Sequence, residues 1–479
     1  MKELKMYING KFVESRSGKW IDVLNPSTEV VTSRQPEGTI EDVNEALDAA
    51  RAAQKEWAKK PAIERAQYLQ KIASGIRRRN DEFVEIIMRE QGKTRQWASV
   101  EVSVTADYFD YMATFARSIE GEVIPSDRRG ETIILTRRPI GVVAGILPWN
   151  FPFFLIARKA GASLIAGCTI VMKPSQLTPE NCCTFAEVVE EAGLPAGVIN
   201  IVTGKGSVVG HAMAASPKID VVSVTGSVSA GQSIMAAASE NITKVSLELG
   251  GKAPAIVFAD ADLEQAAQWI LDSRIGNNGQ ICNNAERVYV QSSVKDEFTN
   301  ILLAKMKAVK VGDPCLDDNV DMGPLVEARA LESVIAKVEK AVAQGAKILC
   351  GGHRVGNKGY FYPATLLDNC TQDMDIIHEE TFGPVLPIVP FDTTDQVIEW
   401  ANDVEYGLAS AVYTKDLDTA VRVSRELQFG ETYINRENFE AMQGFHAGVK
   451  KSGIGGADGK HGIEEYLVTH VTYLDTHYE

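Results

Sequence analysis

The feature that most constrains the fold of this chain is a regular alternation of short apolar runs and helical stretches after residue 140. Runs that favour strands lie at 142–147, 169–173, 198–202 and 221–225, and a helix is predicted near 180–191. Such alternation is typical of a parallel sheet that is covered by helices on both faces. The first half of the chain is therefore predicted to contain a doubly wound α/β unit.

A second alternating series begins near 255–258 and continues through 287–291, which predicts a second α/β unit and a cleft between the two. The length of 479 residues is enough for such units, each with its own core. Ahead of both units, residues 40–119 have apolar side chains at helical spacing and predict several amphipathic helices. At the start, Asn9 and Gly10 between strand-like runs predict a two-residue hairpin at a sheet edge.

Composition excludes several classes of function. The chain has 49 basic and 64 acidic side chains, and its net charge of −15 repels nucleic acids and anionic membranes. Its seven cysteines contain no CxxC pair, which favours free thiols in a reducing compartment. The N-terminus lacks a secretory apolar core, and the apolar stretch 140–157 is interrupted by Pro148 and Pro152. We expect a cytoplasmic protein without nucleic-acid partners, membrane span or metal site.

Two segments are dense in unusual residue choices, namely the sequence LELGGK at 247–252 and NNGQIC at 277–282, with a helix predicted between them. Cys282 follows glycine and polar residues that suit a loop, and a thiolate there would attack a carbonyl carbon. The other cysteines are mostly expected to be buried structural thiols. A glycine-rich loop at 204–210 has GxGxxxG spacing, which fits a packed turn as well as a nucleotide loop.

In these two motifs, and in Arg287 after the cysteine, the chain resembles the aldehyde dehydrogenase superfamily. Further segments match in the same order along the chain, at 146–152, 173–175, 225–227 and 380–384. The resemblance implies an α/β fold with two doubly wound, Rossmann-like parallel-sheet domains and a small oligomerisation sheet.

It also implies domain boundaries. Residues 1–120 and 140–249 would form the dinucleotide-binding domain, and 250–450 the catalytic domain. Residues 121–139 and 451–479 would form the bridging segment, with its sheet made by 121–139 and a terminal strand at 468–474. Exposed strand edges of this segment would pair between subunits, giving a homodimer or homotetramer.

The resemblance assigns three catalytic roles. Cys282 would attack the aldehyde, and Asn150, with the backbone N–H of the cysteine, would stabilise the negative oxygen that forms. After hydride transfer, Glu248 would act as the general base that activates water to hydrolyse the thioester. From the residues alone, Asn150 also fits a loop residue between prolines and Glu248 a strand-end carboxylate, and their spacing does not place them near Cys282.

The resemblance also predicts a dinucleotide site. Lys173 would bind the hydroxyls of the adenosine ribose, Ser227 the pyrophosphate at a helix start, and Glu380 the nicotinamide ribose. Phe382 would pack against the nicotinamide ring. The other matched cofactor positions are Leu147, Trp149, Gly206 and Leu249.

Gln176 departs from the pattern of relatives that prefer NAD, which commonly carry a glutamate at this position. A glutamate repels the 2′-phosphate of NADP, whereas a neutral amide still binds the ribose without that repulsion. NAD is therefore the first expectation, and NADP is also expected to be accepted.

Two segments, 153–159 and 436–448, are polar for a family whose substrate tunnel is usually aromatic. They resemble the branch of the family that oxidises lactaldehyde and glycolaldehyde, and this likeness assigns Arg158, Asn283, Glu440 and His446 to the substrate. Buried donors and acceptors discriminate a hydroxyaldehyde from an apolar aldehyde, because the latter leaves them unpaired. The alternatives are a structural ion-pair network for these side chains and a substrate carboxylate as the partner of Arg158.

We therefore expect an NAD(P)-dependent oxidation of a small hydroxyaldehyde to its acid, with succinic semialdehyde dehydrogenase as the alternative. A CoA-acylating enzyme is less favoured because Glu248 supplies a base for water. A catalytically silent ligand-binding or structural relative is the remote alternative, and the joint presence of Cys282, Glu248 and Asn150 argues against it.

Overall fold

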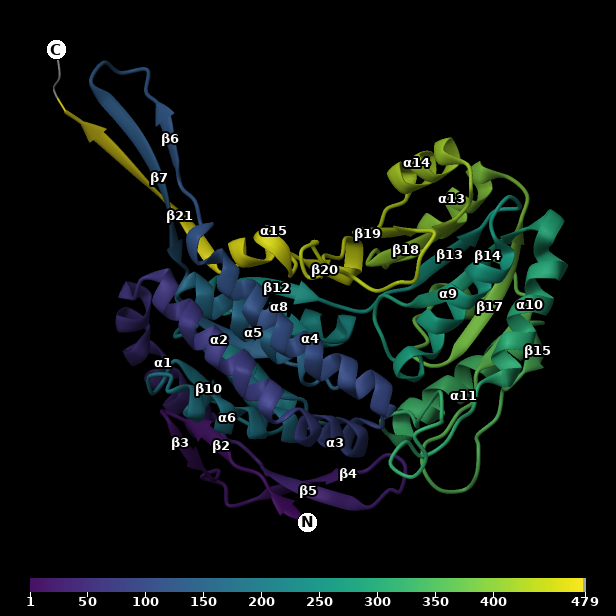
Figure 1. The fold of residues 1–479 in the computed structure, drawn as a ribbon, viewed down its shortest axis with the longest axis horizontal. Coiled ribbons are helices and arrows are strands. Elements are labelled where there is room, and N and C mark those ends of the chain that lie inside the picture. The colour runs from purple at the N-terminus through teal and green to yellow at the C-terminus, as the bar shows by residue number, and fades with distance from the viewer. Residues whose placement is uncertain (477–479) are drawn as a thin grey trace.

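The computed structural model describes residues 1–476 and shows two α/β bodies side by side with a projecting arm (Figure 1). The first body contains an eight-stranded sheet in the order β20-β12-β11-β8-β9-β10-β2-β3, of which the five strands from β12 to β10 are parallel. The strands are β2 (Met6–Ile8), β3 (Lys11–Val13), β8 (Val142–Ile146), β9 (Thr169–Lys173), β10 (Ile199–Ile201), β11 (Val221–Thr225), β12 (Lys244–Glu248) and β20 (Gly453–Ile454).

Helices cover both faces of this sheet, as the alternation in the sequence predicts. Neighbouring residues of β8 face opposite sides, with Val143 in one apolar core and Val142 and Ala144 in the other. Helices α2 to α6 contribute to the first core, and α1, α7 and α8 to the second. The helices are α1 (Ile40–Lys59), α2 (Ala62–Arg78), α3 (Asn80–Gln91), α4 (Arg95–Thr114), α5 (Phe154–Ala166), α6 (Glu180–Ala192), α7 (His211–Ala214) and α8 (Val228–Ala238).

The second body is built on a seven-stranded sheet in the order β15-β16-β17-β14-β13-β18-β19, parallel except for the edge strand β15. Its helices also lie on both faces, so the second predicted α/β unit is confirmed. The strands are β13 (Ala253–Val257), β14 (Ala285–Gln291), β15 (Lys347–Cys350), β16 (Thr365–Asp368), β17 (Val385–Phe391), β18 (Ala409–Tyr413) and β19 (Glu431–Ile434). The helices are α9 (Leu263–Ile275), α10 (Lys295–Ala308), α11 (Ala328–Ala343), α12 (Asp375–His378), α13 (Thr394–Asn402) and α14 (Leu417–Glu426).

The N-terminal hairpin is confirmed at the edge of the eight-stranded sheet. Asn9 and Gly10 have φ values of 52° and 74°, as a two-residue turn between twisted strands requires. A separate three-stranded sheet of β1 (Lys2–Glu3), β5 (Val31–Pro36) and β4 (Trp20–Leu24) was not predicted from the sequence.

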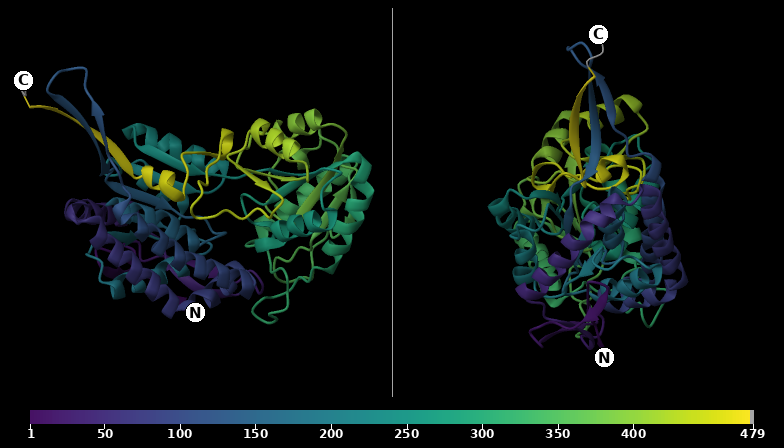
Figure 2. Two further views of the ribbon diagram at one scale, coloured as in Figure 1. Left: turned by 45° about the horizontal axis from the view of Figure 1, so that its top comes forward. Right: turned by 90° about the vertical axis from the view of Figure 1, so that its left-hand side faces the viewer.

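The arm is a three-stranded antiparallel sheet of β6 (Glu122–Pro125), β7 (Glu131–Pro139) and β21 (Leu467–Asp475), and it projects away from both bodies (Figure 2). The first part of the predicted bridging segment 451–479 lies outside the arm. There, β20 is an edge strand of the eight-stranded sheet, and the short helix α15 (Gly459–Glu464) packs near α5. Residues 477–479 of that range lie outside the described residues.

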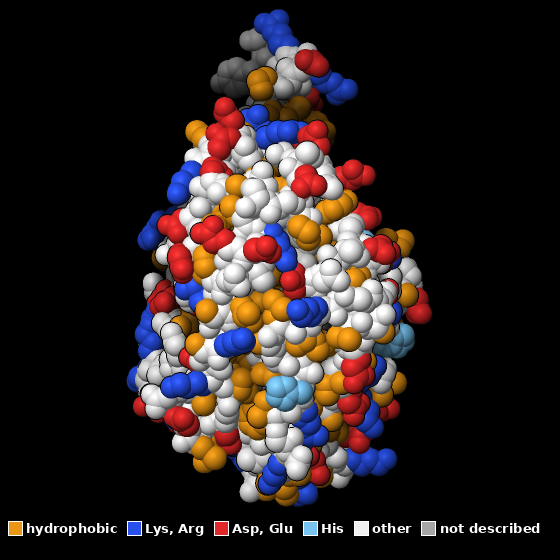
Figure 3. All heavy atoms as spheres, turned by 90° about the vertical axis from the view of Figure 1, so that its right-hand side faces the viewer, with side chains coloured by type: hydrophobic (Ala, Val, Ile, Leu, Met, Phe, Trp, Pro, Cys, Tyr) orange, Lys and Arg blue, Asp and Glu red, His pale blue; other side chains and the backbone are white. Residues whose placement is uncertain are grey.

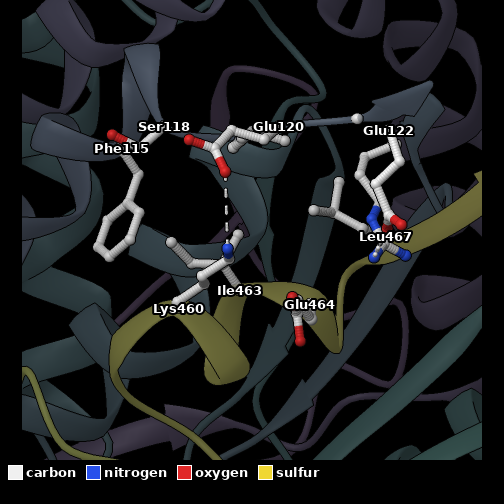
Figure 4. A pocket seen from close by; sticks show the side chains of 11 residues that line it. Phe115, Ser118, Glu120, Glu122, Lys460, Ile463, Glu464 and Leu467 are labelled. Carbon is white, nitrogen blue, oxygen red and sulfur yellow. Dashed lines mark ion pairs between the residues drawn. The ribbon is translucent and has the colours of Figure 1, made fainter. Parts of the chain in front are cut away.

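A shallow pocket of about 220 Å³ lies at the base of the arm (Figure 4). Lys460 of α15 forms an ion pair of 3.8 Å with Glu120 across it. On the face of the molecule shown in Figure 3, acidic and basic side chains are scattered among hydrophobic and uncharged ones. Among residues 1–476, no helix is both long and apolar enough to span a membrane.

Candidate active site

A cavity of about 200 Å³ brings together most of the residues that the sequence predicts for catalysis and substrate binding. Its walls come from α4, from the start of α5 and the loop before it, and from the loops around Cys282 and Glu440. The lining side chains with polar or reactive groups are Glu101, Asn150, Arg158, Thr225, Cys282, Asn283, Glu440, Gln443, His446 and Asp458. Such a volume suits a small substrate.

Cys282 is presented by a loop with an unusual backbone. Asn277 and Asn278 have φ values of 46° and 59°, a left-handed conformation that asparagine tolerates better than most residues. Their side chains also anchor the loop, since Asn277 Nδ2 donates to Asn150 O at 3.0 Å and Asn278 Nδ2 to Pro324 O at 2.7 Å. Cys282 is partly exposed to the cavity, whereas four of the other cysteines are buried as expected, namely Cys168, Cys182, Cys183 and Cys370.

Asn150 lies against this loop. Its Nδ2 donates to Gln280 O at 3.0 Å, two residues before the cysteine, and its side chain lines the cavity. One amide hydrogen is used by this contact, which leaves the other for an oxygen above Cys282. The position suits the predicted stabilisation of a developing negative charge.

The glycines of the LELGGK motif make close backbone contacts that a side chain would prevent. A Cβ atom on Gly251 would lie 2.5 Å from Cys282 O, and one on Gly250 would lie 2.6 Å from Glu380 Oε2. The segment just after β12 therefore contacts both the nucleophile loop and the predicted cofactor carboxylate. The sequence spacing alone did not show this proximity.

Glu248 ends β12 and is buried, with a carboxylate oxygen that accepts a hydrogen bond from Thr225 Oγ1 at 2.8 Å. Burial opposes its charge, but Lys159 and Arg158 outweigh burial and lower its pKa below the ordinary value. The ionised form required of a base is therefore favoured. Thr225 lines the cavity, and Glu248 lies behind it.

The four residues predicted for the substrate meet in one polar network. Glu440 accepts from Asn283 Nδ2 at 2.7 Å and from Arg158 Nη2 at 2.9 Å. Burial disfavours its charge, yet His446 and Arg158 lower its pKa to about 2. His446 Nδ1 contacts Glu431 Oε1 at 2.9 Å. Burial also opposes the charge of His446, but its contacts with Cys282 and Glu431 hold its pKa well above the ordinary value.

Two carboxylates of this network, Asp458 and Glu431, were missed in the sequence. Asp458 accepts two hydrogen bonds from Arg158, at 3.0 Å from Nε and 2.7 Å from Nη2, and burial raises its pKa to about 6. Neither residue belongs to a recognised motif, and each reaches the site only through the folding of distant segments. Asp458 has a φ of 71°, which no sequence signal revealed.

The predicted cofactor residues form a second group of sites beyond the ends of the parallel strands, where doubly wound sheets bind their ligands. Lys173 ends β9 and is buried. Among the described residues its ammonium donates one hydrogen bond, to Pro174 O at 2.8 Å, and burial lowers its pKa to about 8. Ser227 caps α8 by accepting from Ala230 N at 3.2 Å. The Lys173 ammonium can donate further hydrogen bonds to ribose hydroxyls. The N-terminus of α8, at Ser227, can bind a pyrophosphate.

Glu380, Trp149 and Phe382 lie at the other end of this group. Glu380 accepts from Gly251 N at 2.9 Å, and burial raises its pKa to about 7. The rings of Trp149 and Phe382 meet edge to face with centroids 5.4 Å apart. The free oxygen of Glu380 and the adjacent rings fit a ribose and a planar nicotinamide.

The remaining predicted cofactor positions differ in their exposure. Leu147 and Leu249 are buried, while Gly206 is exposed at the start of a π-helical turn, Gly206–Gly210. Gln176 is exposed, and its backbone oxygen accepts from Gln35 Nε2 at 2.7 Å. Its side-chain amide therefore stays available to a ligand.

Comparison with known proteins agrees with this geometry. Lactaldehyde dehydrogenase of Escherichia coli K12 is 59% identical over 471 residues, 98% of each chain. A crystal structure of the E. coli enzyme superposes with a TM-score of 0.98 at 58% identity over 99% of both chains.

Two further relatives are more distant. D-glyceraldehyde dehydrogenase (NADP(+)) of Picrophilus torridus is 37% identical over 98% of this chain and 96% of its own. Betaine aldehyde dehydrogenase of Staphylococcus aureus, solved in complex with NAD+, has a TM-score of 0.97 at 36% identity over 99% of this chain and 96% of its own. The model of the aldehyde dehydrogenase family matches residues 12–472, and this chain therefore belongs to that family.

Proposed function

We propose that this protein oxidises a small 2-hydroxyaldehyde, lactaldehyde or glycolaldehyde, to the corresponding acid with NAD or NADP. The observation that carries the proposal is the network of Asn283, Glu440 and Arg158, which lines the same cavity as Cys282 together with His446. A hydroxyl next to the carbonyl would exchange hydrogen bonds with this network, whereas an alkyl group would displace water from it without offering a hydrogen bond. The similarity to the E. coli lactaldehyde dehydrogenase supports the same substrate class.

The catalytic steps follow from three side chains. The Cys282 thiolate adds to the aldehyde carbon, and the oxygen takes the negative charge near the Asn150 amide. When bound, the nicotinamide accepts the hydride that leaves this carbon, and the carbonyl re-forms as a thioester on Cys282. Glu248 then takes a proton from water, whose oxygen attacks the thioester, and the acid leaves as the thiolate returns.

Arg158 disfavours the semialdehyde alternative. A carboxylate substrate needs an unpaired cation, but Arg158 already binds Asp458 through two nitrogens and Glu440 through one of these. Its charge is therefore matched by two carboxyl groups, the buried Asp458 and the partly exposed Glu440. A neutral hydroxyl substrate fits this network better than a second carboxylate.

We assign dinucleotide binding to the eight-stranded body and the nucleophile to the seven-stranded body. Lys173 ends one strand of the first sheet and Ser227 follows another, while Cys282 and Glu380 lie just before strands of the second. NAD is the proposed cofactor, and NADP is also accepted because Gln176 has no charge that repels its 2′-phosphate.

We also propose a homodimer or homotetramer that forms through the arm, because β6 and β21 are the two edge strands of its sheet within residues 1–476. A cytoplasmic location is proposed because all seven cysteines are free thiols, which suits a reducing compartment.

The test is a comparison of kcat/KM for lactaldehyde, glycolaldehyde, succinic semialdehyde and propanal, each with NAD and NADP. We expect the two hydroxyaldehydes to give the highest values with NAD. A higher value for succinic semialdehyde would replace the proposal with the alternative, and no reduced cofactor with any aldehyde would remove both.

A further inference from the structure

Glu286 is a buried carboxylate that the catalytic steps do not use. It lies in β14, four residues after Cys282, and its side chain is 1% exposed. It forms ion pairs with Lys252 Nζ at 2.7 Å and with Arg274 Nη1 at 2.8 Å. These cations outweigh the cost of burial and lower the pKa of Glu286 to about 2. The side chain is therefore a permanent anion inside the protein.

The same carboxylate also binds the backbone of the predicted cofactor wall. Its two oxygens accept from Thr381 N and Phe382 N, each at 3.0 Å. Phe382 has a φ of 53°, a left-handed conformation that costs a residue with a large side chain about 1 kcal/mol or more. The hydrogen bond from its N–H to Glu286 opposes any return to an ordinary backbone conformation.

The two cations hold the same segment from other directions. Lys252 Nζ contacts Thr381 Oγ1 at 3.3 Å, and Arg274 Nη2 donates to Gly383 O. Arg274 Nη1 also donates to Ala285 O at 2.9 Å, on the strand that follows the nucleophile loop. The cluster of Glu286, Lys252 and Arg274 therefore ties the turn that carries Phe382 to the region behind Cys282.

We propose that Glu286 is a positioning residue for the nicotinamide end of the cofactor, acting through the backbone of Thr381 and Phe382. It holds the Phe382 ring edge to face with Trp149, at the place where the ring would pack on the nicotinamide. This inference rests on the proposed use of NAD or NADP. It predicts that the charge of Glu286 affects cofactor affinity although the side chain itself touches no ligand.

The test measures the Kd of NAD for the complete protein by isothermal titration calorimetry, without aldehyde. Glu286→Gln keeps the size but loses the anion, and we expect it to weaken NAD binding about tenfold, the effect of one charged hydrogen bond. Glu286→Asp, which keeps the charge, is expected to retain part of the affinity. The alkylation rate of Cys282 by iodoacetamide should change little in both variants, because Cys282 reacts without the cofactor.

A double-mutant cycle separates this role from a merely structural one. In a Phe382→Ala background the ring is absent, so Glu286→Gln should have little further effect on the Kd of NAD. Equal effects in both backgrounds, or an unchanged Kd in Glu286→Gln alone, would overturn the inference. If Glu286→Gln does not fold, the double variant Lys252→Met with Glu286→Gln replaces it, because this variant removes both members of one ion pair. Its Kd for NAD is then measured with and without Phe382→Ala, and the same two outcomes would overturn the inference.

Failure of the inference is distinct from failure of the proposed function. A wild-type protein that binds neither NAD nor NADP would contradict the proposed function itself. If the wild-type protein binds NAD and Glu286→Gln binds it with the same Kd, only the role of Glu286 is contradicted.

Discussion

Glu440 is the residue on which discrimination between hydroxyaldehydes and plain aldehydes depends most directly. It binds both Asn283 and Arg158, and it stays ionised because its pKa is held at about 2. We expect Glu440→Gln to lower kcat/KM for glycolaldehyde about 30-fold, since a hydrogen bond with a charged partner contributes about 2 kcal/mol. The value for propanal should change much less. Glu437→Gln, at an ion pair on the surface, is the matched control.

The pKa values of Glu380 and Lys173 predict how NAD affinity depends on pH. Glu380 accepts hydrogen bonds best when ionised, so affinity should be lost as pH falls through about 7. Lys173 donates best when protonated, so affinity should also fall as pH rises through about 8. We expect the Kd of NAD to be lowest between these two values in a calorimetric titration. Glu380→Gln should remove the acidic limb, and an unchanged profile in this variant would contradict the assignment.

Gln176 gives a prediction about cofactor choice. Gln176→Glu places a negative charge next to the predicted 2′-phosphate site, and a repulsion of about 1.4 kcal/mol would lower kcat/KM for NADP about tenfold. The value for NAD should stay nearly the same. Gln428→Glu adds the same charge at an exposed position in the second body and serves as control. Equal losses with NAD and NADP would show that position 176 does not select the cofactor.

A site residue could be predicted from the sequence when it lies in a short, recognisable motif. Cys282 and Glu248 lie in short motifs that resemble those of the aldehyde dehydrogenase family, so the resemblance indicated them from the sequence. Asp458 and Glu431 are single carboxylates without a motif, and only the tertiary fold brings them to Arg158 and His446. Without Asp458, Arg158 was open to interpretation as a cation for a substrate carboxylate.

At the level of elements, the buried parallel strands were predicted best. The strands at 169–173 and 221–225 have the predicted ends, because fully buried strands are continuous apolar runs. The sheet of β1, β4 and β5 was not predicted, since its strands are short and mix polar with apolar residues. The start of α5 was also not indicated by a local cap, because its cap comes from another helix.

That cap is Glu101 of α4, and it predicts a coupling between stability and activity. One carboxylate oxygen accepts from Phe153 N at 2.9 Å and Phe154 N at 3.1 Å, and the other pairs with the fully buried Lys93. Glu101→Gln leaves Lys93 without its anion, which should lower the free energy of unfolding by about 3 kcal/mol. Thermal unfolding measures this change, with Glu120→Gln at an exposed ion pair as control.

The activity of Glu101→Gln should fall as well, because α5 carries Arg158 and begins just after Asn150. We expect kcat to decrease even at temperatures where the variant is fully folded. A variant with wild-type unfolding temperature and kcat would show that the N-terminus of α5 does not need this carboxylate.

At the scale of the whole molecule, the arm exposes apolar side chains that a single chain leaves uncovered. Tyr473 is 67% exposed and Val471 40%, and both lie on one face of β21 because side chains alternate along a strand. Across the sheet, Ile124 pairs in register with Ile133, which pairs with Tyr473, so this face continues onto β6. A sheet that is apolar and open at both edges is typical of a surface that pairs with a second subunit.

We therefore expect the wild-type protein to sediment as a dimer or tetramer, and the double variant Val471→Asp with Tyr473→Asp to sediment as a smaller species. Two buried, unpaired carboxylates at an interface cost several kcal/mol, which is enough to shift the association equilibrium at micromolar concentrations. Leu417→Asp is the control, because Leu417 is 74% exposed on α14 of the second body, away from the arm. If the wild-type protein sediments as a monomer, or if the arm variant keeps the wild-type mass, the arm is not the subunit interface.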